Sequence, residues 1–251
     1  MTAVYSVIVA LCALILGGFL SRAAYALPRG EYREILFPKC HHCGRDLPLT
    51  YIIPIYGSIL SMRCPHCGER EGGRALASEL ICAVLFVLLY LVYGFSYLFF
   101  EYALLVAALL VLSLIDFDIH EIVHSVLFFV LALGVMNFVF SFFSFSLTGT
   151  VWWEHLIGAF VLSLPLFLLM MFTGGIGGGD VKLIFCLGLL LGYKLVLVTF
   201  FFGIVIAALA AVVLHFVCGR GSKYQVALVP FLSLGAAIAL LVGEKLLAAL
   251  F

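Results

Sequence analysis

Eight apolar runs occupy most of this chain and limit the folds open to it more than any other feature. They cover residues 4–27, 76–93, 97–115, 122–143, 153–172, 181–191, 193–217 and 226–247. A helix crosses the hydrocarbon core of a bilayer with about 20 apolar residues, or somewhat fewer where the bilayer thins around it. The mean hydropathy of +1.29 and the 66% of hydrophobic residues exceed the values of soluble domains. We therefore predict an all-α polytopic membrane protein with about eight transmembrane helices.

The distribution of charge predicts how these helices are oriented. The one extended polar stretch, residues 28–75, contains seven of the 13 lysines and arginines. Basic loops are retained in the cytoplasm, so we predict that this loop is cytoplasmic and that the N-terminus lies outside. Arg22 is the first basic residue and follows the first apolar run, which we interpret as a retained span rather than a cleaved signal peptide. Counting loops then places residues 116–121 and 173–180 on the cytoplasmic side.

These boundaries predict three parts of the chain. They are a first transmembrane helix (1–27), a cytoplasmic four-cysteine loop (28–75) and a membrane-embedded domain (76–251). The 13 acidic residues balance the 13 basic ones, which predicts no long-range attraction to nucleic acid. Membrane lipid is the expected surrounding of the chain.

Four cysteines in the polar loop predict a structural zinc site. Cys40 and Cys43 form one CxxC pair, Cys64 and Cys67 form a second, and a glycine follows each pair. Two thiolates three positions apart fit one face of a tetrahedral zinc ion, and the glycine permits the tight turn around it. Disulfides or free thiols are the alternative, but disulfides require the oxidising side of the membrane. The predicted cytoplasmic location therefore favours zinc.

Three of the four aspartates adjoin predicted membrane helices, where a carboxylate is costly and needs a reason. Asp116 and Asp118 follow the run that ends at residue 115, and Asp180 follows a glycine run. Two neighbouring carboxylates can hydrolyse a peptide when one is ionised and activates water while the other is protonated and polarises the carbonyl. On a helix Asp116 and Asp118 point about 200° apart, so only one of them can face Asp180.

The glycine run at 174–179 has two interpretations. Backbone without Cβ atoms can approach an extended peptide closely beside a catalytic carboxylate, which makes Gly177, Gly178 and Gly179 candidate substrate-positioning residues. Lys182, two residues after Asp180, is a further candidate. The run could instead be a flexible turn, with Asp180 capping the helix that follows.

Several stretches resemble one known family. They are GGFLSRAAYALPRG at 17–30, the two CxxC pairs, LIDFD at 114–118, GGGDVKL at 177–183 and, more weakly, VPFLSLG at 229–235. Together they resemble the type IV prepilin peptidases, which are GxGD-type aspartyl proteases of the prokaryotic cytoplasmic (inner) membrane. The resemblance implies that Asp116 and Asp180 are the catalytic pair, acting at the cytoplasmic face, and that Cys40, Cys43, Cys64 and Cys67 bind zinc. It also implies a prepilin or pseudopilin precursor as substrate and, with S-adenosylmethionine, N-methylation of the new terminus.

Two other functions compete with this interpretation. His120, Glu121 and His124 form a literal HExxH, which on a helix would place two imidazoles around a catalytic zinc, with His215 or an aspartate as third ligand. Membrane aspartates also form ion or proton sites in non-enzymatic transporters. A transporter predicts polar groups spread through several spans, whereas the ionisable groups here cluster near one face. The zinc protease leaves the glycine run unexplained.

Overall fold

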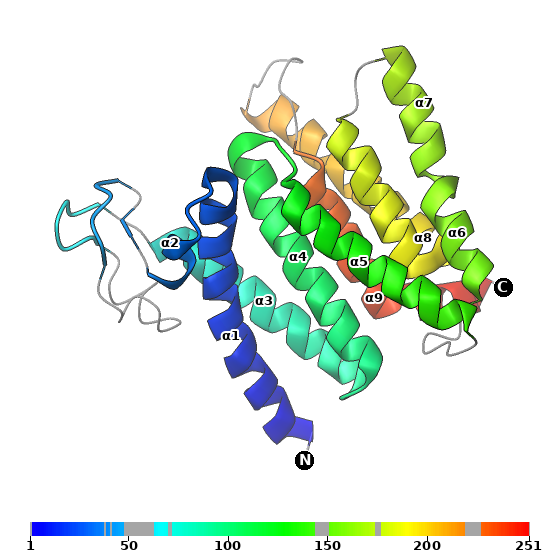
Figure 1. The fold of residues 1–251 in the computed structure, drawn as a ribbon, viewed down its shortest axis with the longest axis horizontal. Helices are drawn as coiled ribbons and strands as arrows, with labels where there is room; N and C mark the ends of the chain where they lie inside the picture. The colour runs from blue at the N-terminus through cyan, green and yellow to red at the C-terminus, as the bar shows by residue number, and fades with distance from the viewer. Residues whose placement is uncertain are drawn as a thin grey trace. The chain divides into compact units, whose positions relative to one another are not determined.

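The computed structural model describes residues 2–37, 39–40, 42–47, 63–69, 72–143, 151–173, 177–218 and 227–250. Apart from the bridge residues Lys39, Asp46 and Arg63, the regular structure of these residues is helical. The elements in chain order are α1 (Thr2–Ala26), η1 (Leu27–Arg29), α2 (Arg33–Leu36), α3 (Gly72–Tyr93), α4 (Tyr97–Ile119), α5 (His124–Phe142), α6 (Trp152–Val161), α7 (Ser163–Thr173), α8 (Gly178–Cys218) and α9 (Val229–Leu250) (Figure 1). They form two compact units, residues 1–99 and 100–251.

The helices confirm the predicted polytopic membrane architecture. Within the described ranges six helices are long and apolar enough to span a bilayer, and the apolar segment Val229–Gly243 of α9 is shorter. The predicted run 153–172 is divided into α6 and α7. The predicted runs 181–191 and 193–217 are the two arms of α8, which join at Gly192 with φ 75° and ψ 170°. These angles are open to glycine and costly for other residues, so Gly192 fixes where the arms separate.

In the first unit, α1 packs closely against α3. A Cβ atom on Gly17 would lie 2.6 Å from Glu79 Cα, and one on Gly18 would lie 3.0 Å from Glu79 Oε1. Ser78 Oγ donates a hydrogen bond of 3.1 Å to Gly17 O across the same contact. Small residues let transmembrane helices approach and form interhelical hydrogen bonds of this kind. The glycines of the stretch GGFLSR, which is part of the family resemblance, therefore let α1 pack closely against α3.

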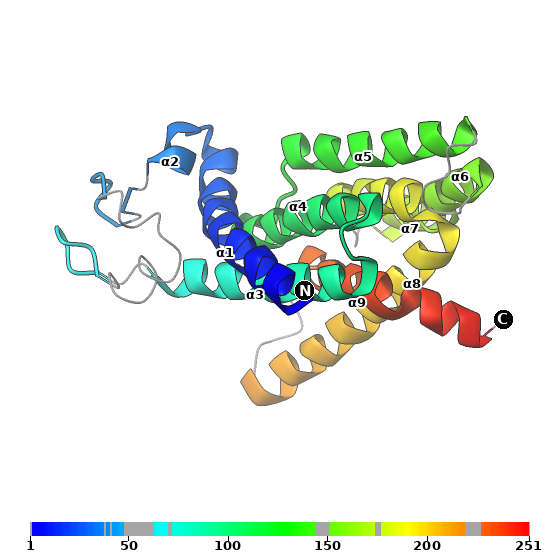
Figure 2. The same ribbon diagram turned by 90° about the horizontal axis from the view of Figure 1, so that it is seen from below.

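In the second unit, the first arm of α8 lies between α5 and α6 (Figure 2). Gly158 of α6 and Gly188 of α8 form the closest crossing, since a Cβ on Gly188 would lie 2.0 Å from Gly158 O. The second arm packs against α9, where a Cβ on Gly235 would lie 2.2 Å from Thr199 O. Backbone meets backbone at both crossings, so no larger side chain fits at either position.

The break at Gly192 leaves helix carbonyls to be satisfied by side chains of neighbouring helices. Asn137 Nδ2 of α5 donates to Leu190 O at 3.2 Å, and His155 Nδ1 of α6 lies 2.9 Å from Leu189 O. Both side chains are buried. An unsatisfied carbonyl is costly inside a membrane, so these bonds stabilise the bend and tie α8 to its neighbours.

Candidate active site

Asp116 lies in the last turn of α4 and is only 6% exposed. Its Oδ2 accepts a hydrogen bond of 3.1 Å from the backbone N–H of Val229, the first residue of α9. The first N–H groups of a helix have no partner within the helix and carry partial positive charge, so they bind anionic groups well. Because Pro230 has no N–H, Val229 supplies the donor at this position. The start of α9 therefore fixes one oxygen of the Asp116 carboxyl group.

Asp180 is the third residue of α8 and is half-buried. Its side chain interacts electrostatically with that of Asp116, so the two aspartates share one site within the second unit. Asp180 also lies in the first turn of its own helix, where a carboxylate is favoured by the helix dipole. The structure thus places two carboxyl groups, separated by 64 positions in sequence, beside the starts of α8 and α9.

The glycines before Asp180 have unequal roles in this arrangement. A Cβ on Gly177 would lie 3.1 Å from Asp180 Oδ2, and one on Gly179 would lie 3.0 Å from Ile122 Cδ1. Ile122 belongs to the segment that connects α4 to α5, so the Gly179 contact packs the start of α8 against the chain that follows Asp116. Gly178 is not in a close contact, because a Cβ there would lie at an ordinary van der Waals distance of 3.7 Å from Met170 Sδ. Residues 174–176 of the predicted run lie outside the described residues.

The other charged residues near the two aspartates differ in their exposure and position. Asp118 is exposed, whereas Asp116 is buried. Lys182 is exposed and lies on the face of α8 that lines an open groove together with His124. Glu101, a buried carboxyl group near the start of α4, is 15 residues from Asp116 along the same helix and takes no part in the site.

The HExxH stretch does not form the helical motif of a zinc protease. α4 ends at Ile119, His120 has φ 56°, and α5 begins at His124, so the stretch crosses a break between two helices. The motif requires both histidines on one face of one helix. Among the described residues, the one group of histidine, cysteine and acidic side chains arranged for a metal is elsewhere. The zinc-protease alternative therefore lacks its structural basis.

That group consists of the four predicted cysteines, whose sulfur atoms lie within 4.8 Å of one another. The Sγ atoms of Cys40 and Cys67 are 3.6 Å apart, and those of Cys43 and Cys64 are 3.8 Å apart. Four sulfurs at about 2.3 Å from a tetrahedral zinc ion lie about 3.8 Å from each other, so the spacing fits zinc. Desolvation opposes ionisation of the Cys64 thiol, but backbone N–H groups of Cys67 and His66 donate to its sulfur and lower its pKa to about 7.

The two CxxC turns have the same backbone structure. The N–H of Gly44 donates to Cys40 O and the N–H of Gly68 donates to Cys64 O, each at 2.9 Å. The two glycines have φ of 69° and 75°. Glycine adopts this left-handed conformation without strain, which explains why one follows each pair. The predicted zinc module is thus a pair of matching turns that bring four thiols together.

Comparison with known proteins identifies the family. Residues 103–212 match the type IV leader peptidase family, and residues 11–93 match the bacterial peptidase A24 N-terminal domain. A prepilin leader peptidase/N-methyltransferase of Bacillus subtilis is 31% identical over 242 residues, which cover 93% of each chain. The chain belongs to the type IV leader peptidase family.

Other relatives and the helices agree with this membership. Prepilin leader peptidase/N-methyltransferases of Stutzerimonas stutzeri and Pseudomonas aeruginosa are 27% and 28% identical, covering 89% and 94% of this chain and 78% and 90% of their own lengths. No solved structure shows a significant match. Family membership and the apolar helices make this a multi-pass protein of the cytoplasmic (inner) membrane.

One contributor to the candidate active site was missed by reasoning from side chains. Val229 acts through its backbone N–H, and an apolar side chain gives no sign of that role. A signal was present in Pro230, because proline is typical of the first turn of a helix and the start of a helix binds carboxylates. The stretch VPFLSLG also supplies Ser233, whose hydroxyl lies 2.8 Å from that of Ser113 on α4. This contact aligns α9 with the helix that carries Asp116.

Proposed function

We propose that this chain is an aspartyl endopeptidase that removes the leader peptide of type IV prepilins or pseudopilin precursors. The observation that carries the proposal is the shared site of Asp116 and Asp180 in a member of the leader peptidase family. Relatives that align over nearly the whole chain carry the name prepilin leader peptidase/N-methyltransferase. The charge distribution supports an active site at the cytoplasmic face and an N-terminus outside.

In the proposed reaction the two carboxyl groups divide the acid and base functions. The ionised member takes a proton from water, and the water oxygen attacks the carbonyl carbon of the scissile peptide. The protonated member donates a hydrogen bond to the carbonyl oxygen and stabilises the charge that develops there. The peptide C–N bond then breaks, as the carboxyl group that took the proton from water passes it to the leaving amine nitrogen. Two neighbouring like charges do not both ionise readily, which favours the singly protonated pair. The Val229 N–H donates to Asp116 Oδ2 and so holds this carboxyl group in place.

We assign substrate positioning to Gly177, Gly178, Gly179 and Lys182. The small residues let backbone of an extended peptide approach Asp180 from the start of α8, and Gly177 already lies against the Asp180 carboxyl group. Lys182 is exposed, two residues beyond Asp180. The precursor's polar leader would then remain at the cytoplasmic surface while its apolar segment lies among the helices.

The basic test of this function is cleavage by the purified chain. The full chain, reconstituted in lipid vesicles, is mixed with a tagged type IV prepilin precursor, and products are identified by mass spectrometry. A single cut between the polar leader and the apolar segment is the expected result. A precursor that stays intact in these vesicles, with the chain correctly folded, would overturn the proposal.

We also assign a structural zinc ion to the four thiols of the cysteine module. The expected result is about one zinc ion per chain, because four thiolates form a closed tetrahedral site. Cys43→Ser and Cys67→Ser should lower the zinc content toward zero and expose the backbone near residues 39–47 and 63–69 to protease. Metal content is measured by plasma mass spectrometry. Cys12→Ser is the matched control, since Cys12 is an exposed free thiol on α1, and an unchanged zinc content in the module variants would refute the assignment.

N-methylation is the second activity that we propose, and S-adenosylmethionine is its methyl donor. It is supported by the names of the aligned relatives and by the complete set of four cysteines. Vesicles that cleave the precursor should transfer a labelled methyl group from S-adenosylmethionine to the new N-terminal amine. The label is located by sequencing the cleaved product. Efficient cleavage without label would remove the methyltransferase activity and leave the peptidase intact.

A further inference from the structure

The helix that carries Asp116 ends in a cap that includes a histidine. The N–H of His120 donates a hydrogen bond of 3.1 Å to Asp116 O, and His120 has φ 56°. A backbone bond of this span, made by a residue in the left-handed region, is the αL cap of a helix C-terminus. In the part of the chain that the structure describes, His120 is the one residue other than glycine with a positive φ. The cap of α4 thus has a side chain at the position that glycine usually occupies.

The conformation of His120 is strained, and the fold does not require a histidine there. Left-handed backbone brings the Cβ atom close to the following carbonyl oxygen, whereas glycine forms the same cap without that contact. His120 is exposed, so its ring does not fill the core. Strained residues that persist beside reactive groups are typical of functional sites. The strain therefore points to a role for the imidazole.

The cap also brings the side chain of His120 to that of Asp116. In an αL cap, the side chain of the left-handed residue packs toward the residue whose carbonyl accepts its N–H. These two residues are His120 and Asp116. An electrostatic interaction between their side chains agrees with this geometry. The last carbonyls of α4 carry partial negative charge, which favours a positively charged imidazole at this end of the helix.

The surroundings of Asp116 and Asp180 differ in this respect. Among the described residues, Asp116 is acted on by the Val229 N–H from α9, by His120 from the α4–α5 connection and by Asp180 from α8. A backbone donor and a positive charge both stabilise a carboxylate that is shielded from water. The groups that act on Asp180 are Asp116 and the backbone of Gly177. The charge of His120 therefore acts on one member of the pair.

We infer that His120 is a positioning residue whose imidazolium favours the ionised form of Asp116, so that Asp116 is the member of the pair that takes the proton from water. The inference rests on the proposed peptidase function and divides its two roles. Asp116 then passes that proton to the leaving amine nitrogen, while Asp180 keeps its own proton and donates the hydrogen bond to the carbonyl oxygen. His120 neither gives nor takes a proton. Histidine loses its charge near neutral pH, so the effect belongs to acidic solution.

Three substitutions separate the charge of His120 from its backbone conformation. His120→Asn and His120→Gly suit the left-handed region and carry no charge. His120→Lys keeps a positive charge but suits that region less well. Each full chain is reconstituted in vesicles with a tagged prepilin precursor, and kcat/KM for leader removal is measured from acidic to alkaline pH.

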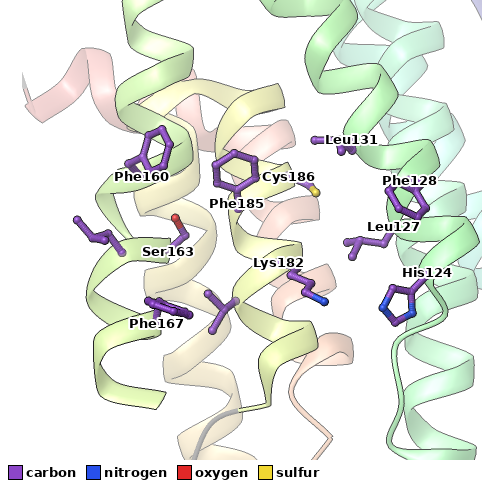
Figure 3. Close-up of a pocket in the computed structure, with 12 residues that line it drawn as sticks. His124, Leu127, Phe128, Leu131, Phe160, Ser163, Phe167, Lys182, Phe185 and Cys186 are labelled. Carbon is purple, nitrogen blue, oxygen red and sulfur yellow. The ribbon is translucent and has the colours of Figure 1, made fainter. Parts of the chain in front are cut away.

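His124→Asn is the matched control. Asp118, Glu121 and His124 are the other titratable side chains near this connection, and all three are exposed. His124 lies four residues beyond His120 and lines a mostly apolar groove together with Lys182, and neither aspartate of the pair is among the residues that line it (Figure 3). The pH profile of His124→Asn should equal that of the unaltered chain.

The acid limb of the kcat/KM profile reports the ionisation of the catalytic pair in the free enzyme. Without the charge at position 120 this limb should move upward by about one pH unit, so that His120→Asn and His120→Gly lose about tenfold in rate in acidic solution. Both should match the unaltered chain in alkaline solution, and His120→Lys should keep the original acid limb. A purely structural cap predicts the reverse order, with lysine impaired at every pH and asparagine and glycine unimpaired. That order, or equal profiles for all variants, would overturn the inference.

Infrared spectroscopy tests the same interaction without substrate. In the full chain carrying Asp180→Asn, Asp116 titrates without its partner, and the C=O absorption of its protonated form is identified by its loss when Asp116→Asn is added. With His120→Asn this absorption should persist to a pH about one unit higher, and with His120→Lys it should not. An absorption that titrates alike with histidine and asparagine at position 120 would refute the interaction, whether or not the precursor is cleaved.

The unaltered chain distinguishes failure of this inference from failure of the peptidase function. If it cuts the precursor and His120→Asn has the same pH profile, only the role of His120 is wrong. If it does not cut the precursor, the peptidase function is wrong and the catalytic role of His120 is wrong with it.

Discussion

Asp180→Asn is expected to reduce cleavage by about 10⁴-fold, and Asp116→Asn should have a similar effect, because each variant removes one of the two groups that share proton transfer. Asparagine keeps the size of the side chain and can still accept the Val229 N–H through its amide oxygen. It can neither ionise nor donate a carboxylic proton. The measurement is the initial rate of leader removal in vesicles. Each variant must have the same Tm as the unaltered chain, so that a lost rate does not reflect unfolding.

Two nearby acidic residues provide the controls for this prediction. Asp118→Asn changes an exposed carboxylate two positions from Asp116, and Glu121→Gln changes the residue that would be the general base of a zinc protease. Both variants should keep cleavage near that of the unaltered chain. Full activity of either Asp116→Asn or Asp180→Asn would contradict the aspartyl mechanism. Loss of activity in Glu121→Gln alone would instead support the metal mechanism.

The second large effect is expected at the crossing of α6 and α8. Gly188→Ala should destabilise the second unit, because the new Cβ would lie 2.0 Å from Gly158 O and backbone cannot move away as a flexible side chain can. Forced separation of two packed helices costs about 3 kcal/mol or more, which corresponds to a fall in Tm of roughly 10 °C. Thermal unfolding is followed in detergent micelles by intrinsic fluorescence.

Gly73→Ala is the matched control for that substitution. Gly73 lies in α3, and a Cβ at this position would meet nothing within 4 Å. Alanine favours helix more than glycine by about 1 kcal/mol, so this variant should be as stable as the unaltered chain or more stable. Because the first arm of α8 also carries Asp180, Gly188→Ala should lose cleavage together with stability. A Tm unchanged by Gly188→Ala would show that the α6–α8 crossing is looser than the structure describes.

Much of the fold could be predicted from the sequence, because a helix that crosses a bilayer is visible as one long apolar run. A chain in lipid must satisfy its backbone within each segment, so each long apolar run forms a helix whatever its neighbours are. Each CxxC pair and its glycine also form a turn within five residues, so their role could be predicted from the sequence. The structure confirms that the four thiols come together. The assignment of Asp116 and Asp180 as catalytic residues remains a prediction, which the asparagine variants test. Their common site is in agreement with it.

Other features depended on contacts between distant segments. Spacing alone did not choose between Asp116 and Asp118, and the resemblance favoured Asp116. The structure shows the physical difference, since Asp116 is buried against the start of α9 while Asp118 is exposed. The HExxH letters likewise suggested a helical zinc site, but the helix ends at Ile119, so His120 lies in the break while His124 begins the next helix.

The sequence by itself determined which segments form apolar helices, which cysteines form a module and which aspartates lie near helix ends, because hydropathy and short motifs act over a few residues. The tertiary structure decided which helix start faces Asp116 and how α8 bends at Gly192. These depend on backbone donors and on glycines that let helices approach. The reason is that an N–H group or an absent side chain gains its role only from the partner that the fold places beside it.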